Sequence, residues 1–393
     1  MNTPAKAAGP INIEPALKAL AAALHGEGPA VELSIGENGA LVVGHVETPG
    51  CDDAVAVVRT SGSTGAPKAT VLTVESLAAS SMATALALKG EGQWLLALPV
   101  QYVAGIQVLV RSLFAGTRPW VMDMSHGFTP EAFTAAAQEL TDKIRFTSLV
   151  PTQLQRLLDA PSTETLAALR RFNAVLLGGA PAPASLLAAA REAGVRVITT
   201  YGSAESCGGC VYDGFPLEGV SVRVEEDGRI LLGGDTIAAG YLESPESTDT
   251  FFEEDGVRWY RTSDLGSIDD DGRLTVLGRA DDVIITGGVK VSAAHVQEEL
   301  EKSDGVAAAF VAGVPSAEWG QAVAAYVALA DPAPAPGAEG GDTAVVLEQQ
   351  WHRMLGVLAP KTVLAASALL MLPNGKPDRL AMTAELKARH QGK

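Results

Sequence analysis

The stretch Thr60-Ser61-Gly62-Ser63-Thr64-Gly65-Ala66-Pro67-Lys68 follows directly on the β-branched run at residues 55–58. Its glycines allow the backbone to approach an anion closely, its hydroxyl groups can donate hydrogen bonds to phosphate oxygens, and Lys68 adds a positive charge. A turn of this composition after a buried strand predicts a phosphate-binding loop. The simpler alternative is a polar Gly/Ser turn without a ligand.

This loop does not have the spacing of a P-loop nucleotidase. A Walker A loop places Lys, and then Ser or Thr, directly after its last glycine. Here Ala66 and Pro67 separate Gly65 from Lys68, and Ala69 follows. The sequence therefore disfavours a P-loop NTPase while it retains a phosphate-binding loop.

Short apolar runs alternate with longer alanine-rich stretches on both sides of this loop. The alternation is typical of an α/β domain, and several runs end in Gly, Pro or hydroxyl residues, where open α/β sheets bind ligands. The predicted strands lie at residues 55–58, 94–98, 146–150, 174–177 and 195–199.

The pattern of apolar runs and turns changes near residue 212. Runs at residues 220–224, 229–232 and 273–277 are separated by Asp/Gly-rich turns and predict antiparallel strands. Later residues predict a small α+β segment, with strands near 283–285, 307–311 and 322–328 and helices at 293–301 and near 345–358. We therefore expect a large N-terminal core (1–279) of α/β sheets with an antiparallel portion. We also expect a small mobile C-terminal domain (280–393) with a flexible loop at 331–342.

The formal net charge of -17 disfavours nucleic acid as a partner, because no cluster of Lys or Arg offsets it. With 47% hydrophobic residues the chain is too apolar to be disordered. Its apolar stretches are shorter than the roughly 20 residues that a membrane helix needs, and the N-terminus lacks a signal-peptide pattern. We expect a cytoplasmic protein without membrane insertion, and a homo-oligomer is compatible with the sequence.

Cys207 and Cys210 form a Cys-x-x-Cys pair. A zinc site would need further Cys or His ligands, and a thioredoxin-like site would need a cysteine at the start of a helix after a strand. Neither context is evident, so we expect structural cysteines.

Further short motifs follow the phosphate loop in a fixed order. They are Gly178-Gly179-Ala180-Pro181, Tyr201-Gly202-Ser203-Ala204-Glu205, Trp259-Tyr260-Arg261-Thr262-Ser263-Asp264, Gly278-Arg279-Ala280-Asp281-Asp282, Gly287-Gly288-Val289-Lys290 and Leu372-Pro373-Asn374-Gly375-Lys376. Taken singly, Glu205 and Lys376 would each be interpreted as solvated surface residues. Taken in order, the set resembles the adenylate-forming superfamily of acyl-CoA synthetases, nonribosomal peptide adenylation domains and luciferases.

The resemblance implies a role for each motif. Lys376 and Lys68 would be catalytic, Glu205 and Thr64 would hold Mg²⁺, and Asp281 would be the hinge. Gly287, Gly288 and Lys290 would line the path of CoA, which like ATP is a substrate. In this interpretation Tyr201 stacks on adenine and Asp264 accepts both ribose hydroxyls. The residues expected to bind ATP are Thr60, Ser61, Gly62, Ser63, Thr64, Gly65, Lys68, Gly178, Gly179, Ala180, Tyr201, Gly202, Ser203, Asp264 and Arg279.

Within this superfamily, the chain resembles the o-succinylbenzoate–CoA ligases of menaquinone biosynthesis in their short actinobacterial form. The resemblance rests on residues 208–217, on the early phosphate loop, and on residues 98–105 followed by Arg111. Arg111 would bind the carboxylate of o-succinylbenzoate that is not activated, because Arg offers bidentate recognition. The alternative is a surface arginine at the end of a helix. The residues expected to contact the acid are Arg111, Tyr102, Gly105, Gly179 and Ser203.

Three positions depart from the superfamily pattern. Ala204 stands where a hydroxyl residue often holds the α-phosphate, Tyr102 stands where many members carry histidine, and Ser263 replaces a glycine. Three alternatives stay open: another small acyl- or aryl-CoA ligase, a stand-alone amino-acid adenylation enzyme, and a non-catalytic nucleotide-binding protein with this fold.

Overall fold

The computed structural model describes residues 9–61, 67–242, 250–329, 341–372 and 377–391. These residues form two compact units. Unit 1 comprises residues up to 223 together with 231–262 and 270–274, and unit 2 comprises residues 224–230, 263–269 and those from 275 onward.

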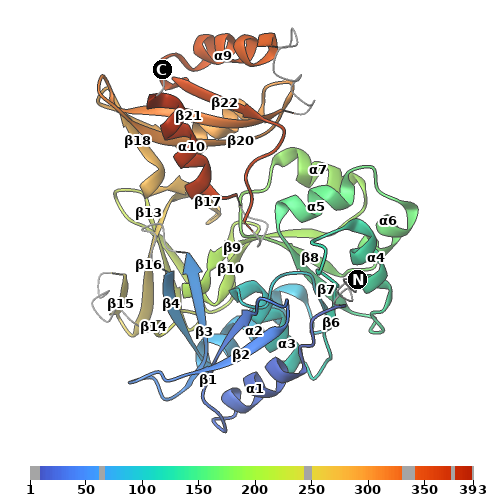
Figure 1. Cartoon of the computed structure of the whole chain (residues 1–393). Helices are drawn as coiled ribbons and strands as arrows, with labels where there is room; N and C mark the ends of the chain where they lie inside the picture. The colour runs from blue at the N-terminus through green and yellow to red at the C-terminus, as the bar shows by residue number, and fades with distance from the viewer. Residues whose placement is uncertain (1–8, 62–66, 243–249, 330–340, 373–376, 392–393) are drawn as a thin grey trace, which may run out of the picture. The chain divides into compact units, whose positions relative to one another are not determined.

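Unit 1 holds most of the helices and strands (Figure 1). Its helices are α1 (Glu14–Leu24), α2 (Val74–Leu88), α3 (Val103–Phe114), α4 (Pro130–Gln138), α5 (Pro151–Leu158), α6 (Thr163–Arg170), α7 (Ala184–Glu192) and the 3-10 helix η1 (Ala204–Ser206). Its strands are β1 (Ala30–Ile35), β2 (Leu41–Val46), β3 (Ala54–Ser61), β4 (Pro67–Thr73), β5 (Gln93–Leu96), β6 (Trp120–Val121), β7 (Arg145–Leu149), β8 (Ala174–Leu177), β9 (Val197–Ser203), β10 (Gly208–Tyr212), β11 (Phe215–Pro216), β14 (Gly240–Tyr241) and β15 (Phe251–Glu254).

The central sheet of unit 1 has the strand order β11-β10-β9-β8-β7-β5-β6. Strands β5 to β9 pair in parallel, whereas β10 pairs with β9 in the antiparallel direction. Because β5 and β8 are buried along their whole length, they show apolar runs (residues 94–96 and 174–177) rather than alternating apolar and polar residues. The α/β fold predicted from the sequence is confirmed.

Helices α4 to α7 cover this sheet and supply one large apolar core. Figure 1 shows them in green beside β7 and β8. Phe133, Leu154, Leu169 and Leu186, one residue from each helix, belong to the same buried cluster as Val175 of β8. This packing fixes the positions of the parallel strands, and therefore the position of the edge formed by their carboxyl ends.

A second sheet of unit 1 has the order β14-β4-β3-β1-β2. Its β3 and β4 are antiparallel and are joined through residues 62–66, so the predicted phosphate loop closes a hairpin. Helix α2 starts directly after β4, with a capping box in which Thr73 Oγ1 accepts a 3.1 Å hydrogen bond from Ser76 N.

A third sheet has the order β12-β13-β16-β15, with β17 beside β16. Its strands β12 (Val220–Val224), β13 (Arg229–Gly234), β16 (Val257–Ile268) and β17 (Leu274–Arg279) carry residues of both units. The antiparallel β portion predicted after residue 212 is confirmed by these strands, such as β15 against β16.

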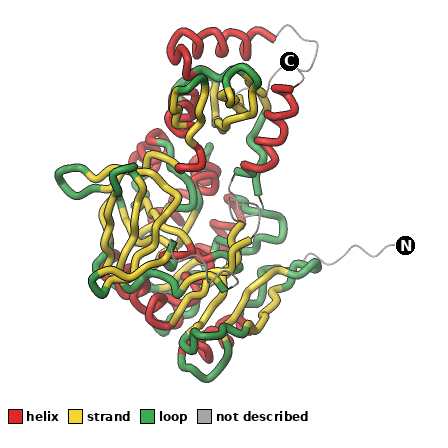
Figure 2. Tube along the Cα trace, turned by 90° about the vertical axis from the view of Figure 1, so that its left-hand side faces the viewer, coloured by secondary structure: helices red, strands yellow, loops and turns green. Residues whose placement is uncertain are grey.

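Unit 2 contains a sheet in the order β19-β18-β21-β20, with β22 parallel to β21. Helices α8 and α9 pack on one face of it through Val296, Leu300 and Trp351, and α10 packs on the other through Met382 and Leu386. Figure 2 shows these strands in yellow with helices in red on either side. The elements of unit 2 are η2 (Ala280–Asp282), β18 (Val283–Thr286), β19 (Val289–Ser292), α8 (Ala293–Glu301), β20 (Val306–Ser316), β21 (Gly320–Leu329), α9 (Gly341–Leu355), η3 (Gly356–Leu358), β22 (Thr362–Ala366) and α10 (Arg379–Gln391).

Several predicted elements have their predicted bounds, namely β8, β12 and α8. The strand predicted at 195–199 instead runs from Val197 to Ser203, because its second half pairs with β10. The helix predicted near 345–358 ends at Leu355, where the chain tightens into η3. Most of the predicted flexible loop at 331–342 lies outside the described residues.

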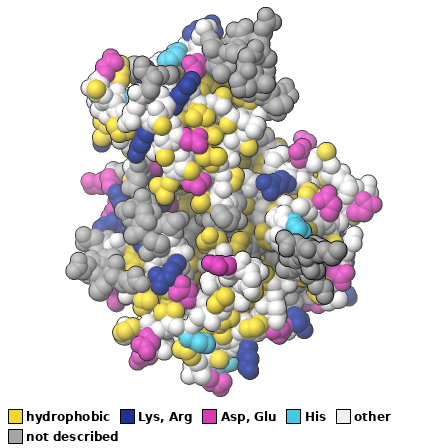
Figure 3. Space-filling view, in the orientation of Figure 1, with side chains coloured by type: hydrophobic (Ala, Val, Ile, Leu, Met, Phe, Trp, Pro, Cys, Tyr) yellow, Lys and Arg dark blue, Asp and Glu magenta, His cyan; other side chains and the backbone are white. Residues whose placement is uncertain are grey.

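Among the residues that the structure describes, no helix combines the length and apolarity needed to span a bilayer. On the face drawn in Figure 3, Lys and Arg side chains are scattered among Asp and Glu side chains rather than gathered in one patch.

Candidate active site

The phosphate loop is anchored by the facing ends of β3 and β4. Thr60 is the register partner of Lys68 across this hairpin, so both residues stand at the base of the loop. Gly62, Ser63, Thr64 and Gly65 lie outside the described residues. A Walker A loop leads into a helix, whereas this loop leads into a strand, which agrees with the exclusion made from its spacing.

The side chain of Lys68 is exposed, and its ammonium lies over an aromatic ring. Its Nζ is 4.8 Å from the centroid of the Tyr241 ring. Tyr241 reaches this position because β14 pairs with β4, with Tyr241 opposite Thr70. At this distance the ammonium group makes a cation–π interaction with the ring face of Tyr241, which favours one orientation of Lys68.

Glu205 lies in η1, immediately after β9, and is only 7% exposed. The hydroxyl of Tyr241 donates a 2.7 Å hydrogen bond to Glu205 Oε1. Burial and the charge of Glu205 raise the pKa of Tyr241 above its usual value, so this hydroxyl keeps its proton. The interpretation of Glu205 as a solvated surface acid is wrong, because this carboxylate is buried and specifically paired.

The segment leading to Glu205 forms the end of β9. Gly202 has φ 156°, and a side chain there would place its Cβ 2.0 Å from Gly208 O, so the close approach of β10 requires glycine. Tyr201 is half-buried opposite Val211.

The hydroxyl oxygen of Ser203 is buried without a hydrogen-bond partner among the described residues. That free hydroxyl stands next to Ala204, the position at which the hydroxyl typical of the superfamily is missing.

Gly178, Gly179 and Ala180 follow β8 at the same edge of the sheet. Gly178 N donates a 3.1 Å hydrogen bond to Leu149 O, the last residue of β7. Because Leu177 pairs with Thr199, the glycine turn lies beside the strand that carries Tyr201 and Ser203. Two of the predicted ATP-binding motifs therefore meet at the carboxyl edge of the parallel strands, where such sheets bind ligands.

Arg111 is 7% exposed, so the alternative of a surface arginine is wrong. Its guanidinium lies 5.3 Å from the centroid of the Trp94 ring, and its Nε is buried without a hydrogen-bond partner. No ion pair joins Arg111 to a carboxylate in the part of the chain that the structure describes. A buried cation without an anion is unfavourable, which points to an absent negatively charged partner.

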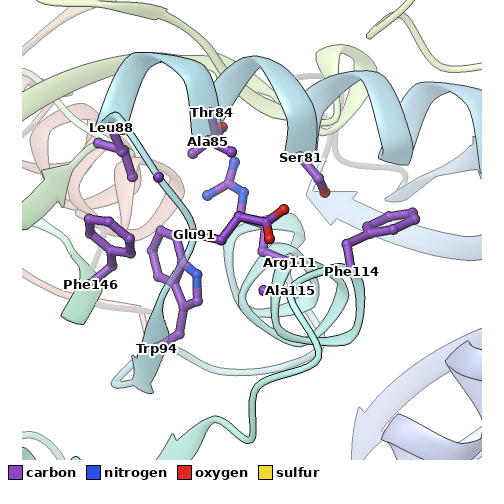
Figure 4. Close-up of a pocket in the computed structure, with 11 residues that line it drawn as sticks. Ser81, Thr84, Ala85, Leu88, Glu91, Trp94, Arg111, Phe114, Ala115 and Phe146 are labelled. Atoms are coloured by element: carbon purple, nitrogen blue, oxygen red, sulfur yellow. The ribbon is translucent and has the colours of Figure 1, made fainter. Parts of the chain in front are cut away.

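The pocket beside Arg111 lies between α2 and the first halves of β5 and β7 (Figure 4). Its volume is about 20 Å³, which is room for about one water molecule. Trp94 and Phe146 line it near the amino ends of their strands, so it faces the edge opposite Gly178. Helix α3 connects Arg111 to the opposite edge of the sheet. Gln107 precedes Arg111 by one turn of this helix, and its side-chain amide donates a 2.7 Å hydrogen bond to Cys207 O.

Tyr102 and Gly105 stand at the start of α3. Tyr102 is the half-buried N-cap residue, and its carbonyl accepts a 3.0 Å hydrogen bond from Gly105 N. A Cβ at Gly105 would lie 2.3 Å from Pro99 O, so glycine lets the helix start against the turn after β5. The backbone packing of Gly105 is thus clear, while its contact with an acid remains a prediction.

In unit 2, Asp264 and Arg279 lie together. Arg279 Nη1 is 3.5 Å from Asp264 Oδ1, and both side chains are partly exposed. The resemblance implies that Asp264 binds the ribose and that Arg279 also binds ATP, and their proximity agrees with a shared location. Asp281 lies in the adjoining turn η2, and Lys376 lies outside the described residues.

Gly287 and Gly288 form the two-residue turn between β18 and β19, and Lys290 is exposed on β19. Gly287 N donates a 3.0 Å hydrogen bond to Trp319 O, which ties this turn to the neighbouring hairpin. The assignment of these residues to the path of CoA stays a prediction.

The two cysteines of the Cys-x-x-Cys pair are buried in unit 1. Burial raises the pKa of Cys207 and that of Cys210 to about 12. Cys207 Sγ also donates a 3.2 Å hydrogen bond to Ser76 Oγ, which joins the end of η1 to α2. These buried, neutral thiols support the structural interpretation of the pair.

Sequence reasoning missed Tyr241, Gln107 and Ser80. Ser80 Oγ donates to Cys207 O at 3.2 Å, beside the bond from Gln107, so both residues hold the turn that follows Glu205. No spacing rule points to these residues, since each acts through a contact made by distant parts of the chain. A tyrosine following glycine in the apolar segment 237–242 is the only signal that singles out Tyr241.

The donor set at Glu205 fits Mg²⁺. Among the described residues no three His, Cys, Asp or Glu side chains gather into a metal-binding group. Mg²⁺ usually takes one or two carboxylates and completes its octahedron with phosphate oxygens and water. One oriented carboxylate at the base of a phosphate loop therefore suits a metal that arrives with a nucleotide.

A family model described as AMP-binding enzyme matches residues 14–242. The chain is 42% identical over 334 residues to a probable 2-succinylbenzoate–CoA ligase of Mycobacterium tuberculosis, and the match covers 84% of each chain. It is 30% identical to the 2-succinylbenzoate–CoA ligase of Listeria monocytogenes, covering 72% of this chain and 61% of that relative.

Solved structures share the fold. One is the o-succinylbenzoate CoA synthetase (MenE) of Bacillus subtilis in complex with the acyl-adenylate intermediate OSB-AMP, with a TM-score of 0.70 and 26% identity. That match covers 86% of this chain and 70% of the other. Another is ATP-bound MatB of Rhodopseudomonas palustris, with a TM-score of 0.73 and 26% identity over 90% of this chain and 74% of the other.

Proposed function

This chain belongs to the family of AMP-binding enzymes, and from that premise we propose that it joins o-succinylbenzoate to CoA at the expense of ATP. The reaction passes through an acyl-adenylate and belongs to menaquinone biosynthesis. The relatives named as 2-succinylbenzoate–CoA ligases support this choice of acid, as does the structural likeness to MenE with its bound intermediate.

One observation carries the proposal for ATP activation. Lys68 and Tyr241 come from the sheet that contains β3 and β4, Glu205 comes from η1, and the three side chains are in contact at the base of the phosphate loop. They bring together a cation and an oriented carboxylate. This arrangement suits electrostatic stabilisation of phosphoryl chemistry, which requires no protein nucleophile.

In the first half-reaction, a succinyl carboxylate oxygen bonds to the α-phosphorus of ATP, and the bond to the pyrophosphate oxygen breaks. Lys68 balances phosphate charge at the loop, and Lys376 lies between the attacking carboxylate and the α-phosphate. Mg²⁺, when bound, neutralises charge on the phosphates. Glu205 and Thr64 would hold it, while Ser203 donates its free hydroxyl toward the phosphate in place of the hydroxyl missing at Ala204.

Nucleotide positioning falls to residues of the ordered motifs. Tyr201 covers the adenine, Gly178, Gly179 and Ala180 line it, and Asp264 accepts the ribose hydroxyls with Arg279 beside it. A two-oxygen acceptor suits two neighbouring hydroxyl donors. Fixing the nucleotide in this way lowers the entropy cost of bringing the carboxylate in line with the phosphorus.

Recognition of the acid rests on Arg111. o-Succinylbenzoate carries two carboxylates, and only the succinyl one reacts. The buried Arg111 guanidinium, which forms no ion pair with a carboxylate among the described residues, is the proposed bidentate partner of the other carboxylate. Tyr102, Gly105 and Gly179 line the same acid.

In the second half-reaction the CoA sulfur attacks the acyl carbon, loses its proton, and AMP leaves. We assign residues 1–279 to the core and residues 280–393 to a mobile domain that turns about Asp281. The turn withdraws Lys376 and brings Gly287, Gly288 and Lys290 to the path of CoA, so that two reactions share one site.

We propose a cytoplasmic location, because the substrates ATP and CoA are supplied in the cytoplasm.

Pyrophosphate exchange into ATP tests this function. We expect exchange that depends on o-succinylbenzoate and is far weaker with benzoate, fatty acids or amino acids. Exchange supported best by another acid would establish a different acyl-CoA ligase or an amino-acid adenylation enzyme. Exchange with none of them would leave the non-catalytic nucleotide-binding alternative.

A further inference from the structure

We infer that Tyr241 is a positioning residue, which orients the Glu205 carboxylate for the divalent metal and thereby sets the affinity for the metal–nucleotide complex. The inference rests on the proposed function and adds a residue that no motif of the sequence singled out. Tyr241 touches neither the reacting atoms nor, in this account, the metal itself.

The hydroxyl of Tyr241 fixes the orientation of the Glu205 carboxylate. Tyr241 OH lies 2.7 Å from Glu205 Oε1, and the hydroxyl is the donor because the buried carboxylate can only accept. One hydrogen bond occupies one oxygen and fixes the rotation of the group. The other oxygen is then held in a defined direction. A group that donates a hydrogen bond to a metal-binding carboxylate orients that carboxylate and changes its affinity for the metal.

The segment that carries Tyr241 is held by several hydrogen bonds. Ala238 N donates a 2.9 Å hydrogen bond to Glu205 O, so the same segment holds both the backbone and the side chain of Glu205. Ala239 N donates to Val71 O at 3.0 Å, and Arg258 Nε donates to Ala238 O at 2.8 Å. A support fastened at several points can hold a carboxylate within the narrow range that catalysis needs.

Two contacts fix the orientation of the Tyr241 ring. The ring of Phe251 packs against it edge-on, with centroids 5.2 Å apart. Lys68 Nζ lies over the ring at 4.8 Å. One side chain therefore contacts both the cation at the base of the phosphate loop and the carboxylate proposed for the metal, and it couples their positions.

The test compares Tyr241→Phe with Tyr326→Phe. Tyr241→Phe removes the hydroxyl and keeps the ring that contacts Lys68 and Phe251. Tyr326 is a matched control, because it is 4% exposed in unit 2 and its hydroxyl also bonds to a glutamate, Glu385. Calorimetry measures the binding of α,β-methylene-ATP, without acid or CoA, over a series of Mg²⁺ concentrations.

We expect Tyr241→Phe to need about ten- to a hundredfold more Mg²⁺ than the unmodified chain for the same nucleotide affinity. Nucleotide binding without Mg²⁺ should be unchanged, excess Mg²⁺ should restore affinity, and Tyr326→Phe should behave like the unmodified chain. An unchanged Mg²⁺ dependence, or an equal loss with and without Mg²⁺, would overturn the inference and leave a purely structural role.

These outcomes are separable from failure of the proposed function. The binding experiment contains no acid, so an enzyme for a different acid would still reveal the role of Tyr241. An unmodified chain that bound no nucleotide would refute the proposed function and this inference together.

Discussion

The side-chain amide of Gln107 donates a 2.7 Å hydrogen bond to the carbonyl oxygen of Cys207, and thereby fastens α3 to the turn that carries Glu205. Both residues are buried. The same α3 face continues to Arg111 one turn later, so this bond links the proposed recognition of the acid to the proposed metal ligand.

Gln107→Met should lower the free energy of unfolding by about 1–3 kcal/mol, because it removes a buried donor and leaves the carbonyl with the longer bond from Ser80. Urea unfolding measures the change. Gln155→Met, an exposed change on α5, is the control and should stay within about 0.5 kcal/mol of the unmodified chain. Equal stability of the two variants would show that the Gln107 bond contributes nothing.

Arg111→Met should raise the KM for o-succinylbenzoate about ten- to a hundredfold, since a charged hydrogen-bond partner of the substrate is lost. The KM for ATP should not change, and Arg111→Lys should not restore recognition. Because the native cation is buried without an anion, the free energy of unfolding should not fall.

A substrate analogue sharpens this prediction. 3-Benzoylpropionate has the same succinyl chain without the second carboxylate, so the unmodified enzyme should prefer o-succinylbenzoate strongly. Arg111→Met should lose that preference. A variant that kept it would remove Arg111 from the acid site.

Asp264→Asn should raise the KM for ATP about tenfold or more, because an ionised acceptor for the ribose hydroxyls is replaced by a neutral one. The 3.5 Å pair with Arg279 is partly exposed and contributes less than about 1 kcal/mol, so stability should hardly change. Asp227→Asn, in the exposed pair with Arg229, is the control. Deoxy-ATP analogues should distinguish the unmodified enzyme from Asp264→Asn, and equal discrimination by both would contradict the role of Asp264.

Cys210 should make the protein less stable at alkaline pH. Burial raises its pKa from 9.0 to about 12 in the folded chain, so above pH 9 the unfolded chain releases a proton that the folded chain keeps. The contribution of Cys210 to stability is therefore fully present below pH 9 and falls by about 1.4 kcal/mol per pH unit above it. Unfolding of the unmodified chain and of Cys210→Ala from pH 8 to 10.5 measures this. Identical pH slopes would contradict the assignment.

Local sequence signals sufficed for much of the fold. Apolar runs bounded by Gly and Pro predicted β8 and β12, and amphipathic spacing predicted α8, because in each case burial is decided by the segment's own pattern. The end of β9 could not be predicted in this way. Its continuation to Ser203 depends on pairing with β10, a partner that the pattern of β9 does not specify.

The site shows the same division. Lys68, Glu205 and Asp264 could be predicted as site residues because ordered motifs mark them, and Arg111 because the resemblance to o-succinylbenzoate–CoA ligases implies a basic residue there. Tyr241 could not, since its role depends on β14 joining β4 and on a hydroxyl meeting a carboxylate 36 residues earlier in the chain. Long-range contacts of this kind leave no local period in the sequence.

Activation of the carboxylate through its adenylate can be tested by product analysis. The enzyme is incubated with o-succinylbenzoate, ATP and Mg²⁺, with and without CoA, and the products are identified by mass spectrometry. Without CoA we predict o-succinylbenzoyl-AMP and pyrophosphate in equal amounts, and with CoA the thioester and AMP in equal amounts. Formation of ADP and phosphate, or release of AMP that does not depend on the acid, would contradict the account.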